Sequence, residues 1–223
     1  MKCLLCHETF YPPFTFRYFL TLQQEDPVCP RCRQRFSLIE EPICERCGRP
    51  YREPLCEDCK TWKTIGNALE KNRSVYQYNE WMQEVFARFK FRGDYVIAEA
   101  FRADFTNAFF RHFSRNVLLV PIPLSKERLI ERGFNQAEAL ASFLPLPLWN
   151  ALERRDHEKQ SKKQKRERLT APQFYVKDSK QIEGKDIVLI DDIYTTGATV
   201  YHAATQLRRY GASSVSSFTL IRA

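Results

Sequence analysis

The sequence contains no long apolar run, no signal peptide and no cysteine after residue 59. Nowhere do about 18 apolar residues follow one another without interruption, which excludes an ordinary membrane-spanning helix from this sequence. The first 20 residues are interrupted by Cys, His, Glu, Pro and Arg, and they lack the apolar segment and cleavage site of a secretory signal. We therefore expect a cytoplasmic protein whose cysteine-rich start differs from the rest of the chain.

The size and charge of the chain narrow its class. Its 223 residues suffice for one good-sized domain and a small appendage, and a hydrophobic share of 43% allows a globular core. The net charge is +8, and the whole excess lies in residues 61–223, because residues 1–60 hold equal numbers of basic and acidic side chains. Such an excess suits an anionic partner, and ordinary solubility is the simpler alternative.

The 8 cysteines form four Cys-x-x-Cys pairs, the spacing that directs two thiolates at one tetrahedral Zn2+. A cytosolic chain rarely keeps structural disulfides, and four redox-active copies in one short segment are a poorer explanation. Two pairs complete one site, so four pairs predict two zinc ions. Sequential pairing is the simplest arrangement, and an interleaved one stays open. The sequential ligands are Cys3, Cys6, Cys29 and Cys32 for one site and Cys44, Cys47, Cys56 and Cys59 for the other.

Both zinc sites are predicted to be structural, because four thiolates leave no position for a substrate. So short a segment has little core of its own, and the metal must contribute folding free energy. The stretch 43–59 resembles a zinc ribbon, with Gly48 and Pro50 at the turn after its first pair. His7, beside Cys6, is an alternative ligand. Three basic residues of the ribbon either contact phosphates or are merely solvated: Arg46, Arg49 and Arg52.

The rest of the chain alternates helix-like and strand-like segments, which predicts an α/β domain with a parallel sheet. Apolar residues at helical spacing predict helices over 79–91, 95–113, 131–144 and 195–211. Short aliphatic runs predict buried strands over 116–123, 186–191 and 214–223. Residues 61–75 are predicted to be a connector. We divide the chain into a cysteine-rich domain, 1–62, and a larger domain, 63–223.

Two adjacent carboxylates and a threonine-rich loop follow the apolar residues of the strand predicted at 186–191. Open α/β sheets bind ligands beyond the carboxyl ends of their strands, where Asp191 and Asp192 are expected. The loop from Thr195 to Thr199 enters a helix, so its hydroxyl and N–H groups form a cup for a phosphate. The carboxylates would hold ribose hydroxyls directly or through Mg2+. The pattern predicts a ribose-5-phosphate pocket, and a helix cap followed by a turn is the simpler alternative.

The stretch IVLIDDIYTTGAT, 187–199, resembles the phosphoribosyl-diphosphate (PRPP) signature of type I phosphoribosyltransferases. Residues 120–141 and 89–94, together with the cysteine-rich start, are similar to the ComF branch of that superfamily. The resemblance implies an α/β fold, a type I phosphoribosyltransferase-like parallel sheet with a small N-terminal four-cysteine zinc-ribbon-like domain. It also implies a late role in natural transformation, in which the protein handles incoming single-stranded DNA beside a membrane channel and a ComFA-type DNA translocase.

The same resemblance assigns roles to residues that match the family's motif. Asp191 and Asp192 would be catalytic and would bind the ribose or its Mg2+. The loop after VPIP lies where these enzymes bind pyrophosphate, and Arg128, Arg132, Asn135 and Gln136 are candidates to line it. Lys90 is either a further phosphate ligand or a solvated residue at a helix end. The cradle of the 5-phosphate would consist of Tyr194, Thr195, Thr196, Gly197, Ala198 and Thr199.

Residues 154–168 hold 8 basic and 3 acidic side chains and are predicted to form a flexible loop between a helix and a strand. In phosphoribosyltransferases a mobile hood closes over the pocket, and positive groups there would neutralise departing pyrophosphate. Alternatively, the basic loop follows a nucleic-acid backbone with salt-dependent affinity, or it is simply solvated. The nucleic-acid candidates are Lys162, Lys163, Lys165, Arg166 and Arg168.

Two functions of different class follow from these patterns. The first is a DNA-handling competence module with a pocket for PRPP or a related ribose phosphate. The second is an active phosphoribosyltransferase, which displaces pyrophosphate at C1 of the ribose in favour of an unknown acceptor. No general base stands out. His157 is the one histidine of the basic loop, and a single histidine in a loop is usually incidental. Because a fold does not determine a function, we take DNA handling as the main prediction and leave activity open.

Overall fold

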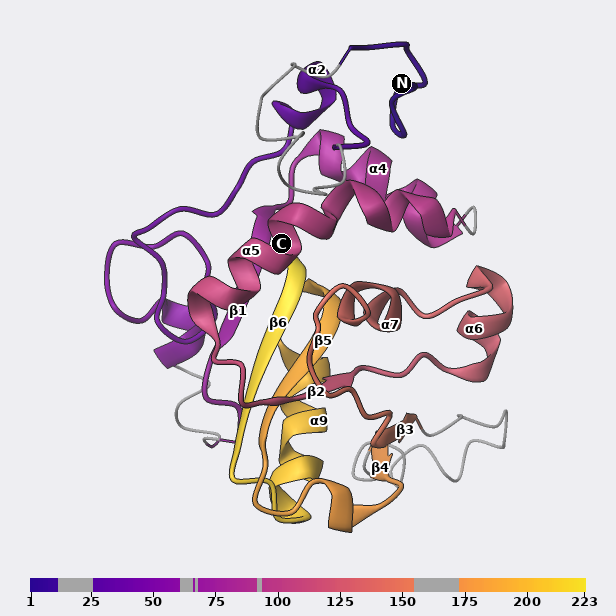
Figure 1. Ribbon diagram of the computed structural model, residues 1–223. Helices are drawn as coiled ribbons and strands as arrows, with labels where there is room; N and C mark the ends of the chain where they lie inside the picture. The colour runs from indigo at the N-terminus through magenta and orange to yellow at the C-terminus, as the bar shows by residue number, and fades with distance from the viewer. Residues whose placement is uncertain (12–25, 61–65, 67, 92–93, 155–172) are drawn as a thin grey trace, which may run out of the picture.

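The computed structural model describes residues 1–11, 26–60, 66, 68–91, 94–154 and 173–223. Its centre is a sheet of four parallel strands in the order β1-β6-β5-β2 (Figure 1). The strands are β1 (Asn72–Gln77), β2 (Leu118–Pro121), β5 (Asp186–Tyr194) and β6 (Ser214–Arg222). The long central pair, β5 and β6, is in register from Asp186 opposite Ser214 to Tyr194 opposite Arg222. The prediction of an α/β fold with a parallel sheet is confirmed.

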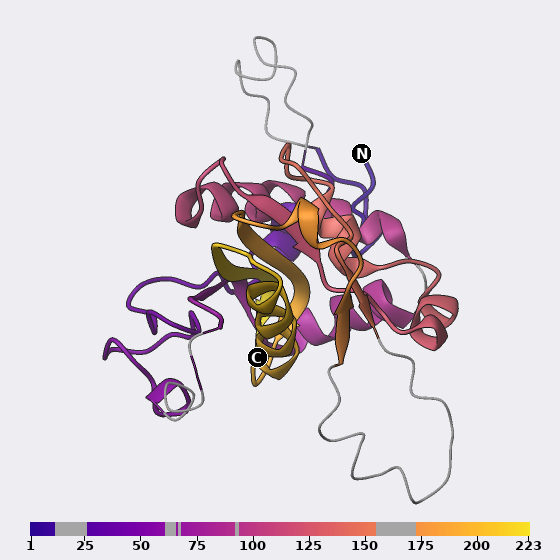
Figure 2. The same cartoon turned by 90° about the horizontal axis from the view of Figure 1, so that it is seen from below.

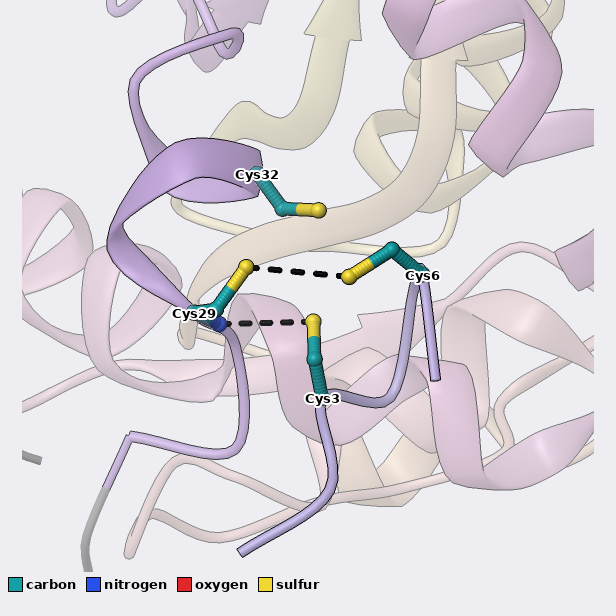
Figure 3. Close-up of side chains that lie close together, drawn as sticks. All are labelled: Cys3, Cys6, Cys29 and Cys32. Carbon is teal, nitrogen blue, oxygen red and sulfur yellow. Dashed lines mark hydrogen bonds between the residues drawn. The ribbon is translucent and has the colours of Figure 1, made fainter. Parts of the chain in front are cut away.

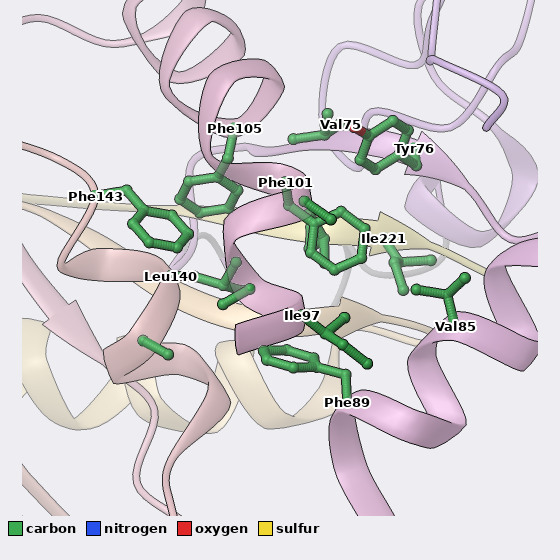
Figure 4. Packing of buried hydrophobic residues seen from close by; sticks show 14 of the residues in the cluster. Val75, Tyr76, Val85, Phe89, Ile97, Phe101, Phe105, Leu140, Phe143 and Ile221 are labelled. Atoms are coloured by element: carbon green, nitrogen blue, oxygen red, sulfur yellow. The ribbon is translucent and has the colours of Figure 1, made fainter. Parts of the chain in front are cut away.

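Both faces of the sheet are buried, because its central strands are apolar on both sides. Val188 and Ile190 of β5 belong to one hydrophobic core, and Ile187 and Leu189 belong to the other. The second core lies under α9 (Ala198–Arg209). Figure 2 shows this helix, in yellow, from below. The first core, part of which Figure 4 shows, is closed by α4 (Glu80–Phe91), η1 (Tyr95–Phe101), α5 (Arg102–His112) and α7 (Gln136–Ala141).

The connector predicted over residues 61–75 is wrong for its last part, because residues from Asn72 onward form the edge strand β1. The mixed sequence NRSVYQ carries no continuous apolar run, so it gave no strand signal. The free edge of β1 is covered by the cysteine-rich segment. The Ile39 N–H donates to the Val75 carbonyl at 2.9 Å, and the Gln77 N–H donates to the Ser37 carbonyl at 2.9 Å. This covering removes an exposed strand edge.

Two predicted helices differ from the structure in their continuity. The helix predicted over 131–144 is two helices, α6 (Lys126–Arg132) and α7, because Gly133 adopts φ 78° and ends α6. A left-handed residue of this kind is a common helix terminator, and glycine adopts it without steric cost. The helix predicted over 95–113 begins as the 3-10 helix η1 and becomes α-helical only at Arg102.

The strand that carries the two aspartates is longer than predicted. β5 continues three residues past Asp191, because Ile193 and Tyr194 pair with Ile221 and Arg222 of β6. The two aspartates therefore lie within the strand, and the threonine-rich loop begins only after Tyr194. The pairing partner, which is distant in the sequence, decides this boundary.

The basic stretch joins two short antiparallel strands, β3 (Leu152–Arg154) and β4 (Phe174–Val176), and not a helix to a strand as predicted. Buried Leu152 and Phe174 hold this hairpin on the second core, and a short 3-10 turn, η3 (Ser179–Gln181), follows it. Only Arg154 of the basic loop belongs to the described residues. His157 and the predicted nucleic-acid contacts Lys162, Lys163, Lys165, Arg166 and Arg168 lie outside them.

The two cysteine groups pack on different cores, which lie on opposite faces of the sheet. The first group, with α2 (Pro30–Arg33), belongs to the core beneath α4 and α5. Arg88 of α4 donates to the Leu5 carbonyl at 2.7 Å. The second group belongs to the core beneath α9, where the Asn72 amide donates to the Cys47 carbonyl at 3.1 Å. The cysteine-rich segment therefore packs against both faces of the sheet at its β1 edge instead of forming a core of its own.

Candidate functional site

Each set of four cysteines gathers at one point, in the sequential arrangement. Within each group all Sγ atoms lie within 4.8 Å of one another. The Sγ atoms of Cys6 and Cys29 are 3.7 Å apart (Figure 3), and those of Cys47 and Cys56 are 3.6 Å apart. A tetrahedral Zn2+ with Zn–S bonds of about 2.3 Å places its sulfurs about 3.8 Å apart. Both groups therefore fit a structural zinc ion with four thiolate ligands.

Backbone N–H groups already point at one sulfur of each group. Cys29 N–H donates to Cys3 Sγ at 3.3 Å, and Cys56 N–H donates to Cys44 Sγ at 3.4 Å. Burial opposes ionisation of these thiols, but the surrounding N–H groups outweigh it and lower the pKa of Cys3 to about 6 and that of Cys44 to about 7. Such thiols are readily deprotonated, as zinc ligation requires.

Other polar residues of the zinc segment have contacts of their own. His7 lies outside both groups and faces the guanidinium of Arg88 at 3.5 Å. Of the three arginines that the sequence offered as phosphate contacts, Arg46 donates to the Gly66 carbonyl, and Arg49 forms an ion pair with Asp58 at 3.0 Å. Arg52 is exposed.

A second cluster of charges lies on the carboxyl-terminal half of β5. Lys90 Nζ of α4 is 3.0 Å from Asp192 Oδ2, and Arg132 Nη1 at the end of α6 is 3.7 Å from the same oxygen. Asp192 and Arg132 are only 7% and 8% exposed, so their charges are held largely away from water. Buried charges of this kind persist only when they are paired. Three elements that are separate in the sequence thus bring two cations and a carboxylate to one place.

The helix start after α6 fixes the position of Arg132. Gln136 Oε1 accepts a hydrogen bond from Arg132 Nη1 at 3.0 Å, and Asn135 caps α7 by accepting from the Ala137 N–H at 3.0 Å. The Asn135 amide also donates to the Ile122 carbonyl at the end of β2. Arg132 Nε is buried and has no acceptor among the described residues. An unsatisfied buried donor is costly, and an anionic ligand at this position would satisfy it.

The pKa of Asp191, next to this cluster, differs from that of an exposed carboxyl. Burial, followed by the neighbouring charge of Asp192, raises the pKa of Asp191 to about 8, and nearby Lys90 and Arg154 oppose the shift. Its Oδ1 accepts a hydrogen bond from the Asp192 N–H at 2.8 Å. Two carboxyls so close together cannot both ionise easily without a cation. The pair is therefore suited to bind a metal ion or hydroxyl donors.

The threonine-rich loop connects β5 to α9, and Gly197 is the N-cap of that helix with φ 82°. A Cβ atom on Gly197 would collide with the hydroxyl of Tyr194, and the positive φ also disfavours other residues, so glycine is required here. Thr196 Oγ1 accepts a hydrogen bond from the Ala198 N–H at 3.3 Å. The first turn of α9 contains no acidic residue. The positive dipole end of α9 is therefore available to an anion.

The structure brings together some of the predicted site residues and leaves one apart. Lys90, Arg132, Asp191 and Asp192 form one cluster, and Tyr194–Thr199 continues from it along the chain. Arg128 is exposed on α6. Burial lowers the pKa of Arg154, and the nearby positive charge of Arg128 lowers it further. The sequence did not single out Arg154, because it lies at the start of a run of similar basic residues.

Comparison with known proteins agrees with this architecture. A model of the double zinc ribbon domain matches residues 1–60, and a model of the phosphoribosyl transferase domain matches residues 129–223. Competence protein ComFC of Bacillus subtilis is 48% identical over 99% of this chain and 94% of the relative. Competence protein ComFC of Streptococcus pneumoniae is 37% identical over 100% of both chains. The chain belongs to the ComFC family.

Membership of the ComFC family confirms the resemblance inferred from the PRPP-like signature and the cysteine pairs. Among solved structures, a hypoxanthine phosphoribosyltransferase from Staphylococcus aureus is similar with a TM-score of 0.33 and 18% identity, over 59% of this chain and 64% of that one. As for membranes, the described helices include none with the length and apolarity needed to cross a bilayer.

Proposed function

We propose that this ComFC-family protein handles incoming single-stranded DNA on the cytoplasmic side during natural transformation, and that it carries a pocket for PRPP or a related ribose phosphate. The competence names of its relatives support the first part. The cluster around Asp192 supports the ribose-phosphate pocket. It joins carboxylates and cations in the carboxyl-terminal half of the parallel strand β5, and the start of α9 follows that strand.

The observation that carries the pocket is the convergence of Lys90 and Arg132 on Asp192. Asp191 and Asp192 would bind the ribose hydroxyls or the Mg2+ that accompanies PRPP, and that ion would neutralise part of the pyrophosphate charge. The loop Tyr194–Thr199 would hold the 5-phosphate. Lys90 and Arg132 now neutralise the Asp192 carboxylate. When the ligand binds, they would contact its phosphate oxygens instead, with Arg128 at the rim.

DNA handling rests on the position of the charge and on family membership. The whole net charge of +8 lies in residues 61–223, and basic groups at 154–168 would contact the phosphate backbone with strong dependence on salt. A ComFA-type translocase is the proposed partner, since the family implies work beside the DNA channel. The proposed place of this work is the cytoplasm.

An active phosphoribosyltransferase is a second candidate. The two cations at Asp192 favour it, because Lys90 and Arg132 would stabilise negative charge on pyrophosphate as its bond to C1 of the ribose breaks. The acceptor would take that bond at C1. Release of pyrophosphate from Mg2+-PRPP in the presence of nucleobases or DNA distinguishes this candidate from a pocket that only binds.

Calorimetric titration with Mg2+-PRPP tests the pocket. We expect saturable binding to the wild-type protein and loss of saturable binding in the double variant Asp191→Asn, Asp192→Asn. The matched control is Asp186→Asn, an exposed aspartate at the amino end of the same strand, which should bind as the wild type does.

Titration with a single-stranded oligonucleotide before and after PRPP tests the link to DNA. A changed DNA affinity in the presence of PRPP supports a pocket that regulates DNA handling. DNA binding without any PRPP binding would mean that the signature survives as a scaffold, and it would refute the proposed ligand. Equal PRPP affinity in the wild type and the double variant would refute the assignment of the aspartates.

A further inference from the structure

One buried arginine joins the second cysteine group to the threonine-rich loop. Arg222, near the end of β6, is 5% exposed. Its Nη2 lies 3.9 Å from Cys47 Sγ. Its Nη1 donates to the carbonyl of Tyr194 at 3.1 Å and to the carbonyl of Thr195 at 3.0 Å, and it also donates to the backbone oxygen of Ala223. A single guanidinium therefore contacts a metal-binding thiol, the last residue of β5 and the first residue of the loop.

A second contact runs through the side chain of Tyr194. The Arg222 guanidinium lies 5.0 Å from the centre of the Tyr194 ring, a cation–π distance. The hydroxyl of that tyrosine packs against Gly197, the left-handed residue at which α9 begins. The position of Arg222 thus affects both the backbone at the start of the loop and the glycine at its end.

The second cysteine group contributes to the charge compensation of Arg222. The described hydrogen-bond acceptors of Arg222 are backbone oxygens and one sulfur, and its Nε is buried without an acceptor among the described residues. A buried cation without nearby negative charge is strongly destabilising. Four thiolates around Zn2+ carry net negative charge, so the second centre, through Cys47, supplies counter-charge that helps to keep this arginine in place.

We propose that Arg222 is a positioning residue that couples the second zinc centre to the threonine-rich loop, so that the loop keeps its phosphate-binding shape only while that centre is intact. Loss of the metal or of one thiolate would remove the negative charge beside Arg222 Nη2 and weaken the hold of the guanidinium on the two carbonyls. The ligand of the loop rests on the proposed function above, whereas the coupling itself requires no ligand.

Hydrogen exchange of the loop without ligand tests the coupling. In Arg222→Met we expect the amides of residues 194–199 to exchange faster by about tenfold or more, because a local opening becomes easier. Arg222→Lys, which keeps the charge but not the forked geometry, should fall between the wild type and Arg222→Met. The amides of residues 187–190, in the middle of β5, serve as an internal reference for intact folding.

Cysteine variants test the same coupling from the metal side. Cys59→Ser removes a ligand of the second centre, and we expect faster exchange at residues 194–199. Cys6→Ser is the matched control, because it damages the first centre on the opposite face of the sheet and should leave the loop unchanged. In Arg222→Met, a colorimetric chelator should withdraw one of the two zinc equivalents faster than in the wild type.

Unchanged loop exchange in folded Arg222→Met and Cys59→Ser would overturn the proposal. Equal effects of Cys6→Ser and Cys59→Ser would also overturn it, because the coupling would then not be specific to the second centre. Failure of the proposed function has a different signature: wild-type protein that does not bind Mg2+-PRPP, with the exchange results unaffected.

Discussion

At the scale of single residues, Asp191 shows that a candidate binding site is built at the expense of stability. Its half-buried carboxyl lies beside Asp192, and desolvation followed by that neighbouring charge raises its pKa from 3.8 to about 8. The folded state therefore holds a proton on this group at pH values where the unfolded chain has lost it. Such a group lowers the stability of the fold increasingly as the pH rises from about 4 to about 8.

We expect Asp191→Asn to raise the Tm of the ligand-free protein, with little gain at pH 5 and a larger gain at pH 8. The amide has a similar shape and does not ionise, so it escapes the cost of the buried charge. Thermal melts at pH 5, 6.5 and 8 measure the trend, and the exposed Asp186→Asn provides the control. A gain in Tm that shrinks as the pH rises would contradict the assigned direction of the pKa shift.

Sequence reasoning found the adjoining residues of the candidate site from their pattern, named Lys90 and Arg132 through the family resemblance, and missed Arg222. The two aspartates and the loop after them stand together in the chain, so their pattern was visible. Arg222 gave no signal, because an arginine near the end of an apolar strand resembles any solvated terminal residue. Its role depends on Cys47, which lies 175 positions away in the sequence.

At the scale of elements, aromatic packing ties the first zinc segment to the sheet and the helices. Phe101, at the end of η1, is fully buried, and its ring contacts those of Phe36, Tyr76 and Phe89 at centroid distances of 5.8–6.1 Å. These neighbours belong to the cysteine-rich segment, to β1 and to α4. Figure 4 shows Phe101 between Tyr76 and Phe89 in this core.

We expect Phe101→Ala to lower the free energy of unfolding by about 3–5 kcal/mol, the usual cost of truncating a buried aromatic side chain. The matched control is Tyr175→Ala on β4, where a side chain that is 45% exposed should cost far less. Denaturant titration of both variants measures the difference. Equal losses of stability would mean that this aromatic cluster does not join the elements as the packing indicates.

Two errors of prediction at this scale share one cause. The strand β1 and the extra length of β5 are decided by partners that are distant in the sequence, whereas the α6–α7 break is local and lies at Gly133. Local periodicity identified the helix over 79–91 nearly to the residue, because an amphipathic helix carries its own signal. An edge strand with polar residues carries none, and it forms because β6 pairs with it on one side and residues 37–39 on the other.

At the scale of the whole molecule, the cysteine-rich segment is built into both cores, although its boundary near residue 62 suggested a separate unit. The first group packs beneath α4 and the second beneath α9. Because the free energy of zinc binding is also folding free energy, both metal centres should stabilise the sheet as a whole. The division at residues 62 and 63 stays a prediction about the sequence.

We expect two zinc equivalents per chain by elemental analysis, and we expect a strong chelator to lower the Tm of one cooperative transition by several degrees or more. Calorimetry with and without chelator, together with hydrogen exchange of β5, measures this. Two separate transitions, of which only one responds to the chelator, would show that the zinc segment folds independently. Absence of zinc from the purified protein would refute the interpretation of the cysteine pairs.

The sequence by itself determined the fold class, the four cysteine pairs, the acidic pair with the threonine-rich loop after it, and the family. These features are local patterns, in which spacing along the chain already specifies the chemistry. Only the tertiary structure decided that Lys90 and Arg132 meet Asp192, that the two cysteine groups lie on opposite faces of the sheet, and that Arg222 joins one of them to the loop. Charges from distant segments are brought together only when buried strands and helices pack, and no local spacing records which of them will meet.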